Sequence, residues 1–224
     1  MSEVRMEYEE ERILVPQVSD FLDLDRQFRQ LMFLYEAAIG QMEARLEILN
    51  KEFQFSNDRN PIEDIKSRIK SKESIMNKLS KKGLPMTVSA MTHNILDIAG
   101  IRVVCPFISD VYQVARMILR QKDVELLMIK DYIRDPKENG YRSLHLIVQV
   151  EVPFSEQTRK VPVEIQIRTI AMNFWASTEH QLRYKKERQF TEEMQQQLKY
   201  CADIMAEADM KMQEIAGEFN TEQW

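Results

Sequence analysis

Two stretches in the second half of the chain alternate apolar and polar residues with the two-residue period of a β-strand. They are SLHLIVQVEV (143–152) and VPVEIQIRT (161–169). Successive side chains of a strand point to opposite faces of a sheet, so each stretch predicts one apolar face for burial and one face for polar groups. A short polar segment separates them, which predicts an antiparallel hairpin. Any fold for this chain must accommodate that hairpin.

Helical and strand patterns alternate on either side of the hairpin. Apolar residues recur in steps of three and four from 21 to 55, which predicts a long helix with one apolar face. Further helices are predicted at 89–98, 110–122 and 191–217, a strand or loop leading into a helix at 62–82, and strands at 101–107 and 125–133. This order predicts one α/β (α+β) domain around a mixed β-sheet, flanked by N- and C-terminal helices.

The two ends of the chain are expected to be separate from the central domain. We predict an N-terminal extension at 1–20, a domain at 21–190 that includes the first long helix, and a C-terminal helix at 191–224. Thr191 is expected to cap the start of that helix and Gly217 to end it. The spacing of its apolar residues predicts a packing seam, within the subunit or against a partner, through Met194, Leu198, Cys201, Met205, Ala208, Met212 and Ile215.

Charge is distributed unevenly along the chain. The formal net charge of −5 divides into −6 for residues 1–60, +6 for residues 61–185 and −5 for residues 186–224. A basic centre between acidic flanks favours a polyanion site in the middle of the chain, and the acidic flanks favour a nucleotide over a long nucleic acid. The alternative, that the flanks are merely solvated helices, stays open at this point.

Composition excludes several other classes of protein. No apolar run is long enough to span a bilayer, and the acidic N-terminus lacks the basic start and apolar stretch of a signal peptide. We therefore expect a cytoplasmic protein with no membrane partner. The two cysteines, Cys105 and Cys201, have no metal-ligand spacing, and each lies in an apolar stretch, so both are predicted to be core residues.

Two carboxylates stand where they could bind a cation. Glu164 shares the polar face of its predicted strand with Gln166 and Arg168, and Asp97 lies just before the predicted strand that holds Arg102. Mg²⁺ prefers one or two protein carboxylates and completes its shell with phosphate and water. Two simpler interpretations remain: an exposed Glu–Arg pair on the sheet, and a turn capped by Asp97.

Two further segments suit a nucleotide. The loop KENGYRSLH (137–145) carries Tyr141 beside Gly140, and an aromatic face that stacks on a base contributes about 1–3 kcal/mol. The segment SRIKSKESIMNK (67–78) concentrates cations that suit a polyphosphate, and arginine guanidiniums can also cover a purine ring. The alternatives are that Tyr141 closes the core and that the cations form a solvated face. The sequence contains no Walker A, Ser-His-Asp or metal-thiolate spacing.

Taken together, these segments resemble a known family. SRIKSKESI, DIAGIRVV, DYIRDPKENGYRSLH, VEIQIRT and FWASTEHQLRYK occur in the order seen in RelA/SpoT-type synthetase domains. The resemblance covers roughly residues 20–190 and is strongest to small alarmone synthetases of the RelQ type. It implies a nucleotidyltransferase-like fold and the synthesis of (p)ppGpp, in which the β,γ-pyrophosphate of ATP moves to the 3′-hydroxyl of GDP or GTP and AMP is released.

The resemblance also implies a role for individual residues. Asp97 and Glu164 would be the catalytic residues and would bind Mg²⁺, and Glu164 could instead accept the proton of the 3′-hydroxyl. The ATP site would consist of Arg68, Lys70, Lys72, Ser74, Lys78 and Arg102, with the two arginines on either side of the adenine. The GDP or GTP site would consist of Lys137, Asn139, Tyr141, Ser143, His145 and Gln166, with Tyr141 stacked on the guanine.

The same resemblance bears on what the chain lacks and on its partners. The long members of the family hydrolyse alarmone with an adjacent His-Asp pair, whereas His93, His145 and His180 are each followed by another residue type. We therefore expect synthesis without hydrolysis. A homo-oligomer is implied, a tetramer in small members, with an alarmone or an RNA as an effector. The competing hypothesis is a catalytically silent module that binds single-stranded RNA.

Overall fold

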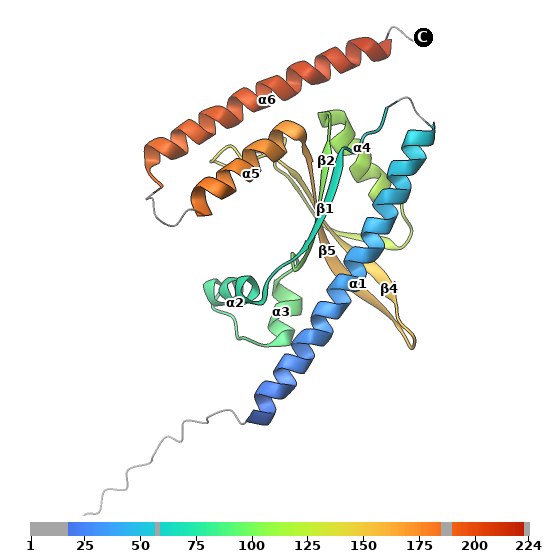
Figure 1. Ribbon diagram of the computed structural model, residues 1–224, viewed down its shortest axis with the longest axis vertical. Helices are drawn as coiled ribbons and strands as arrows, with labels where there is room; N and C mark the ends of the chain where they lie inside the picture. The colour runs from blue at the N-terminus through green and yellow to red at the C-terminus, as the bar shows by residue number, and fades with distance from the viewer. Residues whose placement is uncertain (1–17, 57–58, 185–189, 222–224) are drawn as a thin grey trace, which may run out of the picture.

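A five-stranded mixed sheet forms the centre of the molecule (Figure 1). The computed structural model describes residues 18–56, 59–184 and 190–221. Its elements are α1 (Val18–Ser56), β1 (Asp64–Ile69), α2 (Lys72–Lys81), α3 (Val88–Asn94), β2 (Ala99–Cys105), α4 (Ile108–Leu119), β3 (Val124–Asp131), β4 (Leu144–Pro153), β5 (Thr158–Thr169), α5 (Ile170–Tyr184) and α6 (Glu192–Thr221). The predicted α/β class, with helices at both ends, is confirmed.

The predicted hairpin lies within the sheet. β4 and β5 pair antiparallel, from Leu144 opposite Ile167 to Pro153 opposite Thr158. The strand order is β1-β2-β5-β4-β3, and β5 pairs in parallel with β2 on its other side. The sheet is therefore mixed, as expected, and β5 is its central strand.

The apolar faces of the strands form the core with α1 and α4. Long apolar side chains of α1 are fully buried, among them Tyr35, Met42 and Leu46, which follow the predicted helical spacing. Val111, Val114 and Ile118 of α4 join the same cluster. The other large buried side chains come from the inward positions of β2, β4 and β5, including Ile101, Leu146, Ile165 and Ile167. Helices α1 and α4 therefore cover the apolar face of the sheet, and the polar face is left to other elements.

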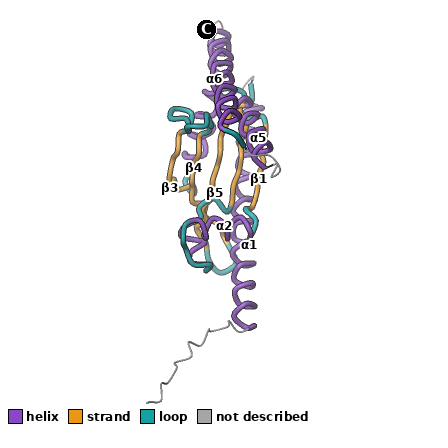
Figure 2. Tube along the Cα trace, turned by 90° about the vertical axis from the view of Figure 1, so that its left-hand side faces the viewer, coloured by secondary structure: helices purple, strands orange, loops and turns teal. Residues whose placement is uncertain are grey.

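The opposite face is covered only in part. α5 follows β5 directly, and α6 packs along α5 (Figure 1). In the view of Figure 2, a strip of sheet lies uncovered between α5 and α2. The polar side chains of β5 project from this uncovered side of the sheet. The alternation of apolar and polar residues in the sequence therefore determines which side chains line it. Among the described helices, none is both long enough and apolar enough to cross a membrane.

Several details of the prediction were wrong. α3 ends at Asn94, so Asp97 lies in the turn before β2 and outside the predicted helix 89–98. Gly217 does not end the C-terminal helix, which continues to Thr221. Thr191 does cap its start, because its hydroxyl accepts a hydrogen bond from the Met194 amide. The N-terminal extension, apart from its last residues, lies outside the described residues.

The inner face of α6 also differs from the predicted seam. Cys201 is exposed, not buried as expected, whereas Cys105 is buried. The buried positions of α6 are Ala202 and Asp209, one residue beyond Cys201 and Ala208. The polar Asp209 is buried because it accepts a hydrogen bond from the Thr169 hydroxyl, an interaction that an apolar pattern cannot reveal. The predicted seam therefore divides: Leu198 and Met205 pack against the inner side of α6, whereas Cys201, Ala208, Met212 and Ile215 are exposed.

Truncation of Leu46 tests the proposed core. Leu46 is fully buried on α1, whereas Ile48, two residues later, is 64% exposed. We expect Leu46→Ala to lower the free energy of unfolding by about 2–5 kcal/mol, because it removes buried methyl groups and leaves a cavity. The matched control, Ile48→Ala, should change it by less than about 0.5 kcal/mol. Urea unfolding followed by circular dichroism measures both, and equal losses would contradict this packing of α1.

Candidate active site

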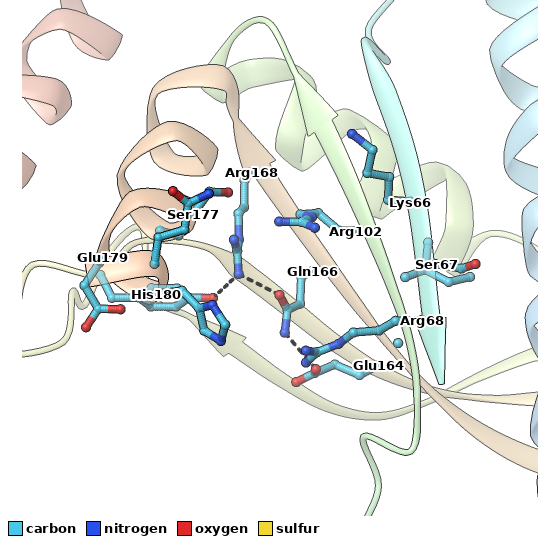
Figure 3. A pocket seen from close by; sticks show the side chains of 15 residues that line it. Lys66, Ser67, Arg68, Arg102, Glu164, Gln166, Arg168, Ser177, Glu179 and His180 are labelled. Atoms are coloured by element: carbon cyan, nitrogen blue, oxygen red, sulfur yellow. Dashed lines mark hydrogen bonds between the residues drawn. The ribbon is translucent and has the colours of Figure 1, made fainter. Parts of the chain in front are cut away.

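A cavity of about 450 Å³ opens on the polar face of the sheet (Figure 3). Its floor consists of polar side chains from β1, β2 and β5, and its wall is the last two turns of α5. The lining residues include Lys66, Arg68, Arg102, Tyr141, Glu164, Gln166, Arg168, Ser177, Glu179 and His180. Cations outnumber carboxylates in this lining, so the cavity suits a polyanionic ligand.

Strand register explains why residues far apart in the sequence meet here. Gly100 of β2 pairs with both Arg68 of β1 and Glu164 of β5, and Arg102 pairs with Gln166. Gly100 has no side chain, and the Arg68 side chain passes 3.6 Å from the place where a Cβ would stand. Arg68 therefore lies across β2 toward the polar face of β5. Arg102 is held by a 3.2 Å hydrogen bond from its guanidinium to the Asn173 side chain of α5.

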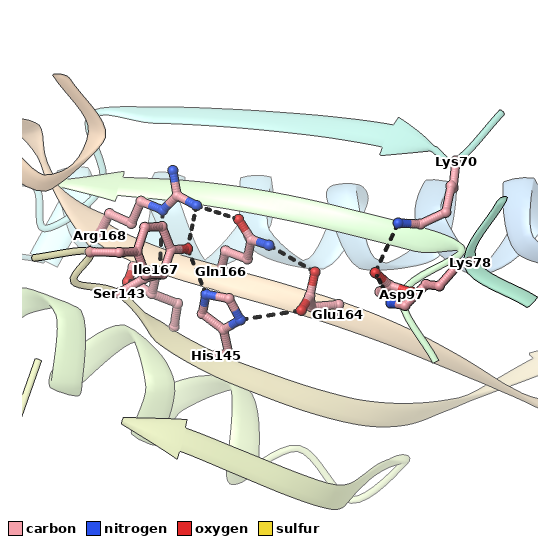
Figure 4. A network of polar contacts seen from close by, with 10 residues as sticks. Lys70, Lys78, Asp97, Ser143, His145, Glu164, Gln166, Ile167 and Arg168 are labelled. Carbon is pink, nitrogen blue, oxygen red and sulfur yellow. Dashed lines mark hydrogen bonds and ion pairs between the residues drawn. The ribbon is translucent and has the colours of Figure 1, made fainter. Parts of the chain in front are cut away.

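Five side chains form a closed ring of hydrogen bonds on this face (Figure 4). Arg168 Nη2 donates to the Tyr141 hydroxyl and to Gln166 Oε1, both at 2.6 Å. Gln166 Nε2 donates to Glu164 Oε2 at 2.8 Å. On the other branch, the Tyr141 hydroxyl lies 2.8 Å from His145 Nε2, and His145 Nδ1 lies 3.2 Å from Glu164 Oε1. Two routes thus connect the Arg168 cation to the Glu164 carboxylate.

Donors and acceptors alternate consistently around this ring. The Tyr141 oxygen accepts from Arg168, so its own proton is free to point at His145 Nε2, and His145 then carries its proton on Nδ1 toward Glu164. Burial raises the pKa of Tyr141, which keeps the proton on its hydroxyl. Burial would also raise the pKa of Glu164, but the hydrogen bonds from His145 and Gln166 outweigh it and hold that pKa below its ordinary value. Glu164 is therefore an ionised carboxylate at neutral pH.

Asp97 stands beside this ring with two lysine partners. Its Oδ2 lies 2.9 Å from Lys70 Nζ and 2.8 Å from Lys78 Nζ. Burial would raise the pKa of Asp97, but the hydrogen bonds from Lys78 and Lys70 outweigh it, so the pKa is lowered. The second oxygen, Oδ1, is buried and has no hydrogen-bond partner among the described residues. The negative charge of Asp97 acts on Glu164. Figure 4 shows Asp97 beyond Glu164, whose carboxylate is turned toward His145 and Gln166.

The loop before β4 carries Tyr141 at the edge of the cavity. It closes on itself through hydrogen bonds from the Gly140 amide to the Lys137 carbonyl at 2.8 Å and from the Tyr141 amide to Asn139 Oδ1 at 3.2 Å. Lys137 Nζ lies over the rings of Tyr132 and Tyr141, 4.7 and 4.9 Å from their centroids. Lys137 and Asn139 also line a separate, open hollow beside Tyr132. Tyr141 thus belongs to this loop and also lines the cavity.

The predicted site residues converge only in part. Arg68, Arg102, Tyr141, Glu164 and Gln166 line one cavity. His145, expected to touch phosphates, is nearly buried and bonded within the ring.

Three other predicted residues have different surroundings. Ser143 is fully buried and accepts a hydrogen bond from Arg168, so it supports the ring and does not reach the cavity. Lys72 points to α1, 5.2 Å from the Phe28 ring. Ser74 bonds to Ser71 at the start of α2.

Some residues of the site were missed from the sequence. Lys66 shares a strand face with Arg68, so the two-residue period could have identified it. The same period placed Arg168 on the polar face with Glu164, where it was assigned no role. Asn173, Ser177 and His180 of α5 recur in steps of four and three toward the cavity region, a signal visible in the sequence that carried no role there.

Removal of one hydroxyl tests the ring. Tyr141→Phe keeps the aromatic face but removes one hydrogen-bond partner from Arg168 and one from His145, in a buried setting. We expect the free energy of unfolding to fall by about 1–3 kcal/mol. The same change at Tyr200, which is 68% exposed on α6, should have little effect. Chemical denaturation compares the two variants, and an unchanged stability of Tyr141→Phe would show that the ring does not form.

Comparison with known proteins assigns the family. The sequence-family model that describes the region found in RelA/SpoT proteins matches residues 67–189. The chain is 40% identical to the GTP pyrophosphokinase YwaC of Bacillus subtilis, over 88% of this chain and 94% of that protein. It is 35% identical to the GTP pyrophosphokinase YjbM of the same organism, over 87% and 90%.

A solved structure agrees in fold. The small alarmone synthetase 1 of Bacillus subtilis, bound to its product pppGpp, superposes with a TM-score of 0.78 at 35% identity, over 86% of this chain and 98% of that one. The chain therefore belongs to the RelA/SpoT family, among its small alarmone synthetases.

Proposed function

We propose that this chain synthesises (p)ppGpp by transferring the β,γ-pyrophosphate of ATP to the 3′-hydroxyl of GDP or GTP. The observation that carries the proposal is the hydrogen-bonded ring that joins an aromatic platform, Tyr141, to an ionised carboxylate, Glu164, inside a cation-lined cavity. The GTP pyrophosphokinase names of YwaC and YjbM support the same reaction. The 3′-oxygen attacks the β-phosphorus, the bond from that phosphorus to the α-phosphate oxygen breaks, and AMP leaves.

The donor nucleotide is assigned to the β1–β2 side of the cavity. Arg68 and Arg102 are planar cations one diagonal apart on paired strands, so an adenine can lie against their guanidiniums. Lys66 and Arg168 add positive charge along the same floor. In phosphoryl-type transfers the protein contributes mainly positioning and charge neutralisation, and these cations supply both.

The acceptor nucleotide is assigned to the Tyr141 side. The Tyr141 hydroxyl donates one hydrogen bond and accepts another within the hydrogen-bonded ring of five side chains. The aromatic ring of Tyr141 therefore has a fixed orientation. In this assignment the ribose of a guanine stacked on Tyr141 lies toward Glu164, which His145 links to the Tyr141 hydroxyl. Lys137 and Asn139 belong to the same loop and lie within reach of the acceptor. Ser143 and His145 act on the acceptor through Arg168 and Tyr141.

We assign a divalent cation to the two carboxylates, Asp97 and Glu164. Asp97 Oδ1 is a buried oxygen without a hydrogen-bond partner among the described residues, and Glu164 is held ionised nearby. Mg²⁺ prefers one or two protein carboxylates and completes its shell with phosphate and water. When bound there, Mg²⁺ would neutralise charge on the pyrophosphate. Lys70 and Lys78, which hold Asp97 Oδ2, orient this carboxylate and place two further cations near the phosphates.

The lowered pKa of Glu164 favours one of its two expected roles. A general base works best when its pKa lies near the operating pH, whereas Glu164 is held below the ordinary value of its type. We therefore assign Glu164 to binding the cation and orienting the 3′-hydroxyl, with the proton passing to solvent or to the departing phosphate. The sequence lacks a His-Asp pair for hydrolysis, which agrees with a synthesis-only enzyme.

The assembly and location of the enzyme are also part of the proposal. α6 exposes several large apolar side chains, among them Tyr200, Ile204, Met210 and Met212. Covering them in a homotetramer would remove this apolar area from water. ATP and GTP are cytoplasmic metabolites, so we place the enzyme in the cytoplasm. An alarmone or RNA effector remains an expectation from the family.

Neutral substitution of the carboxylates tests the reaction. Purified protein with ATP, GDP or GTP, and Mg²⁺ should yield AMP and a 3′-pyrophosphorylated guanine nucleotide. We expect Glu164→Gln and Asp97→Asn each to lower the rate by at least about a hundredfold, since each removes charge at the position of transfer. Glu151→Gln, on the exposed part of β4, is the matched control and should retain activity. Anion-exchange chromatography of the nucleotides measures all four proteins.

Chelation and RNA binding separate the two functional hypotheses. An excess of EDTA should abolish product formation, and added Mg²⁺ should restore it, because two carboxylates alone would repel the phosphates. The competing RNA-binding hypothesis predicts no turnover under any condition, with single-stranded RNA bound in a strongly salt-dependent manner. Turnover that is indifferent to EDTA would contradict the cation site assigned to Asp97 and Glu164.

A further inference from the structure

The C-terminal helix α6 packs against α5 and also against the loop before β4, which carries Tyr141. The indole Nε1 of Trp175, on α5, donates a 2.7 Å hydrogen bond to the backbone carbonyl of Leu198 on α6. Farther along, the Thr169 hydroxyl at the end of β5 donates to Asp209 at 2.5 Å. These two bonds fix α6 to α5 and to the end of β5. The packing between them involves the loop that carries Tyr141.

Gly140 and Ala202 meet at the closest point of this packing. Gly140 has φ +87°, a backbone conformation that residues other than glycine rarely adopt. A Cβ built on Gly140 would lie 2.5 Å from the Cβ of Ala202 and 3.6 Å from Lys199 Cα. The helix and the loop therefore touch backbone to backbone, and two small residues permit it. Ala202 is buried, although the preceding and following residues of α6 are exposed.

Tyr141 rests on the same contact. A small apolar cluster consists of Trp175, Ala176 and Ala202, with Tyr141, Leu198 and Met205 packed against it. The Tyr141 and Trp175 rings lie 6.5 Å apart between centroids. The hydroxyl end of Tyr141 is held by Arg168 and His145. The ring of Tyr141 packs against the cluster of α5 and α6, and the neighbouring Gly140 touches Ala202 of α6.

We propose that Ala202 of α6 is a positioning residue for the acceptor nucleotide, because its contact with Gly140 sets the place of the Tyr141 ring. The inference rests on the proposed function and adds to it a role for the C-terminal helix inside one subunit. A larger side chain at 202 displaces the loop, and Tyr141 moves with it. The arginines of the donor side stand on β1 and β2, and Arg102 is fixed by Asn173 of α5, so they stay in place.

The kinetic signature differs from that of a structural defect. Loss of folding lowers the amount of active enzyme and leaves both KM values unchanged. Displacement of Tyr141 instead weakens the acceptor and spares the donor, since stacking contributes to guanine binding alone. Ala202→Leu should therefore raise the KM for GDP and GTP by about tenfold, in line with the contribution of one stacked base, and change the KM for ATP by less than twofold.

The matched control is the same substitution on the exposed side of the same helix. Ala208→Leu adds the same group away from the loop and should leave both KM values at the wild-type level. The milder Ala202→Val serves if Ala202→Leu folds poorly, as judged by thermal melting. Titration calorimetry with GDP alone, without ATP, gives the binding constant of each variant independently of turnover.

A rescue experiment separates the contact from its parts. Gly140→Ala places a methyl group against Ala202 and should weaken GDP binding. Adding Ala202→Gly removes the atom that it meets, so the double variant should bind GDP more tightly than Gly140→Ala, with the remaining loss due to the positive φ. If the added Ala202→Gly does not strengthen the GDP binding of the Gly140→Ala variant, the proposal is overturned.

The outcomes also distinguish this inference from the proposed function. Wild-type protein and Ala208→Leu that both make no product would refute the function itself. Active wild-type protein, with Ala202→Leu and Ala202→Val that retain the wild-type KM for GDP or that raise both KM values equally, would refute only the role of Ala202.

Discussion

The ring of hydrogen bonds between Arg168 and Glu164 is the interaction on which the site depends. It places a cation and a carboxylate at opposite ends of one polar face and connects them through Gln166 on one branch and through Tyr141 and His145 on the other. Arg168 only donates and Glu164 only accepts, whereas Gln166, Tyr141 and His145 each donate one hydrogen bond and accept one. The arrangement keeps Glu164 ionised in a largely buried position, which an isolated carboxylate would resist.

The fold contributes to this ring in two ways. The central strand β5 supplies three of its members at alternate positions, and β4, its antiparallel neighbour, supplies His145 opposite Gln166. Helices α1 and α4 bury the other face of the same strands, so the alternation cannot slip by one residue without exposing the core. On the polar side, α5 and α6 support Tyr141 through Trp175 and Ala202. Stability and function therefore share one sheet but use opposite faces of it.

Local patterns predicted what depends on neighbours along the chain. The two-residue period identified the hairpin and the shared face of Glu164 and Gln166, and helical spacing identified α1. Partners distant in sequence were not predictable in this way: the lysines around Asp97, the burial of His145 in the ring, and Ala202 against Gly140. The burial of Asp209 on α6, where it accepts a hydrogen bond from Thr169, was not predictable either, because no apolar pattern encodes it.

The position of an isotopic label in the products tests the central claim most directly. Wild-type protein is incubated with Mg²⁺, GDP and ATP labelled separately in the α-, β- or γ-phosphate, and the nucleotides are separated. We expect the β and γ labels to appear together on the guanine nucleotide and the α label to remain in AMP. Transfer of the γ label alone, with ADP as the second product, would contradict a site built for pyrophosphate transfer.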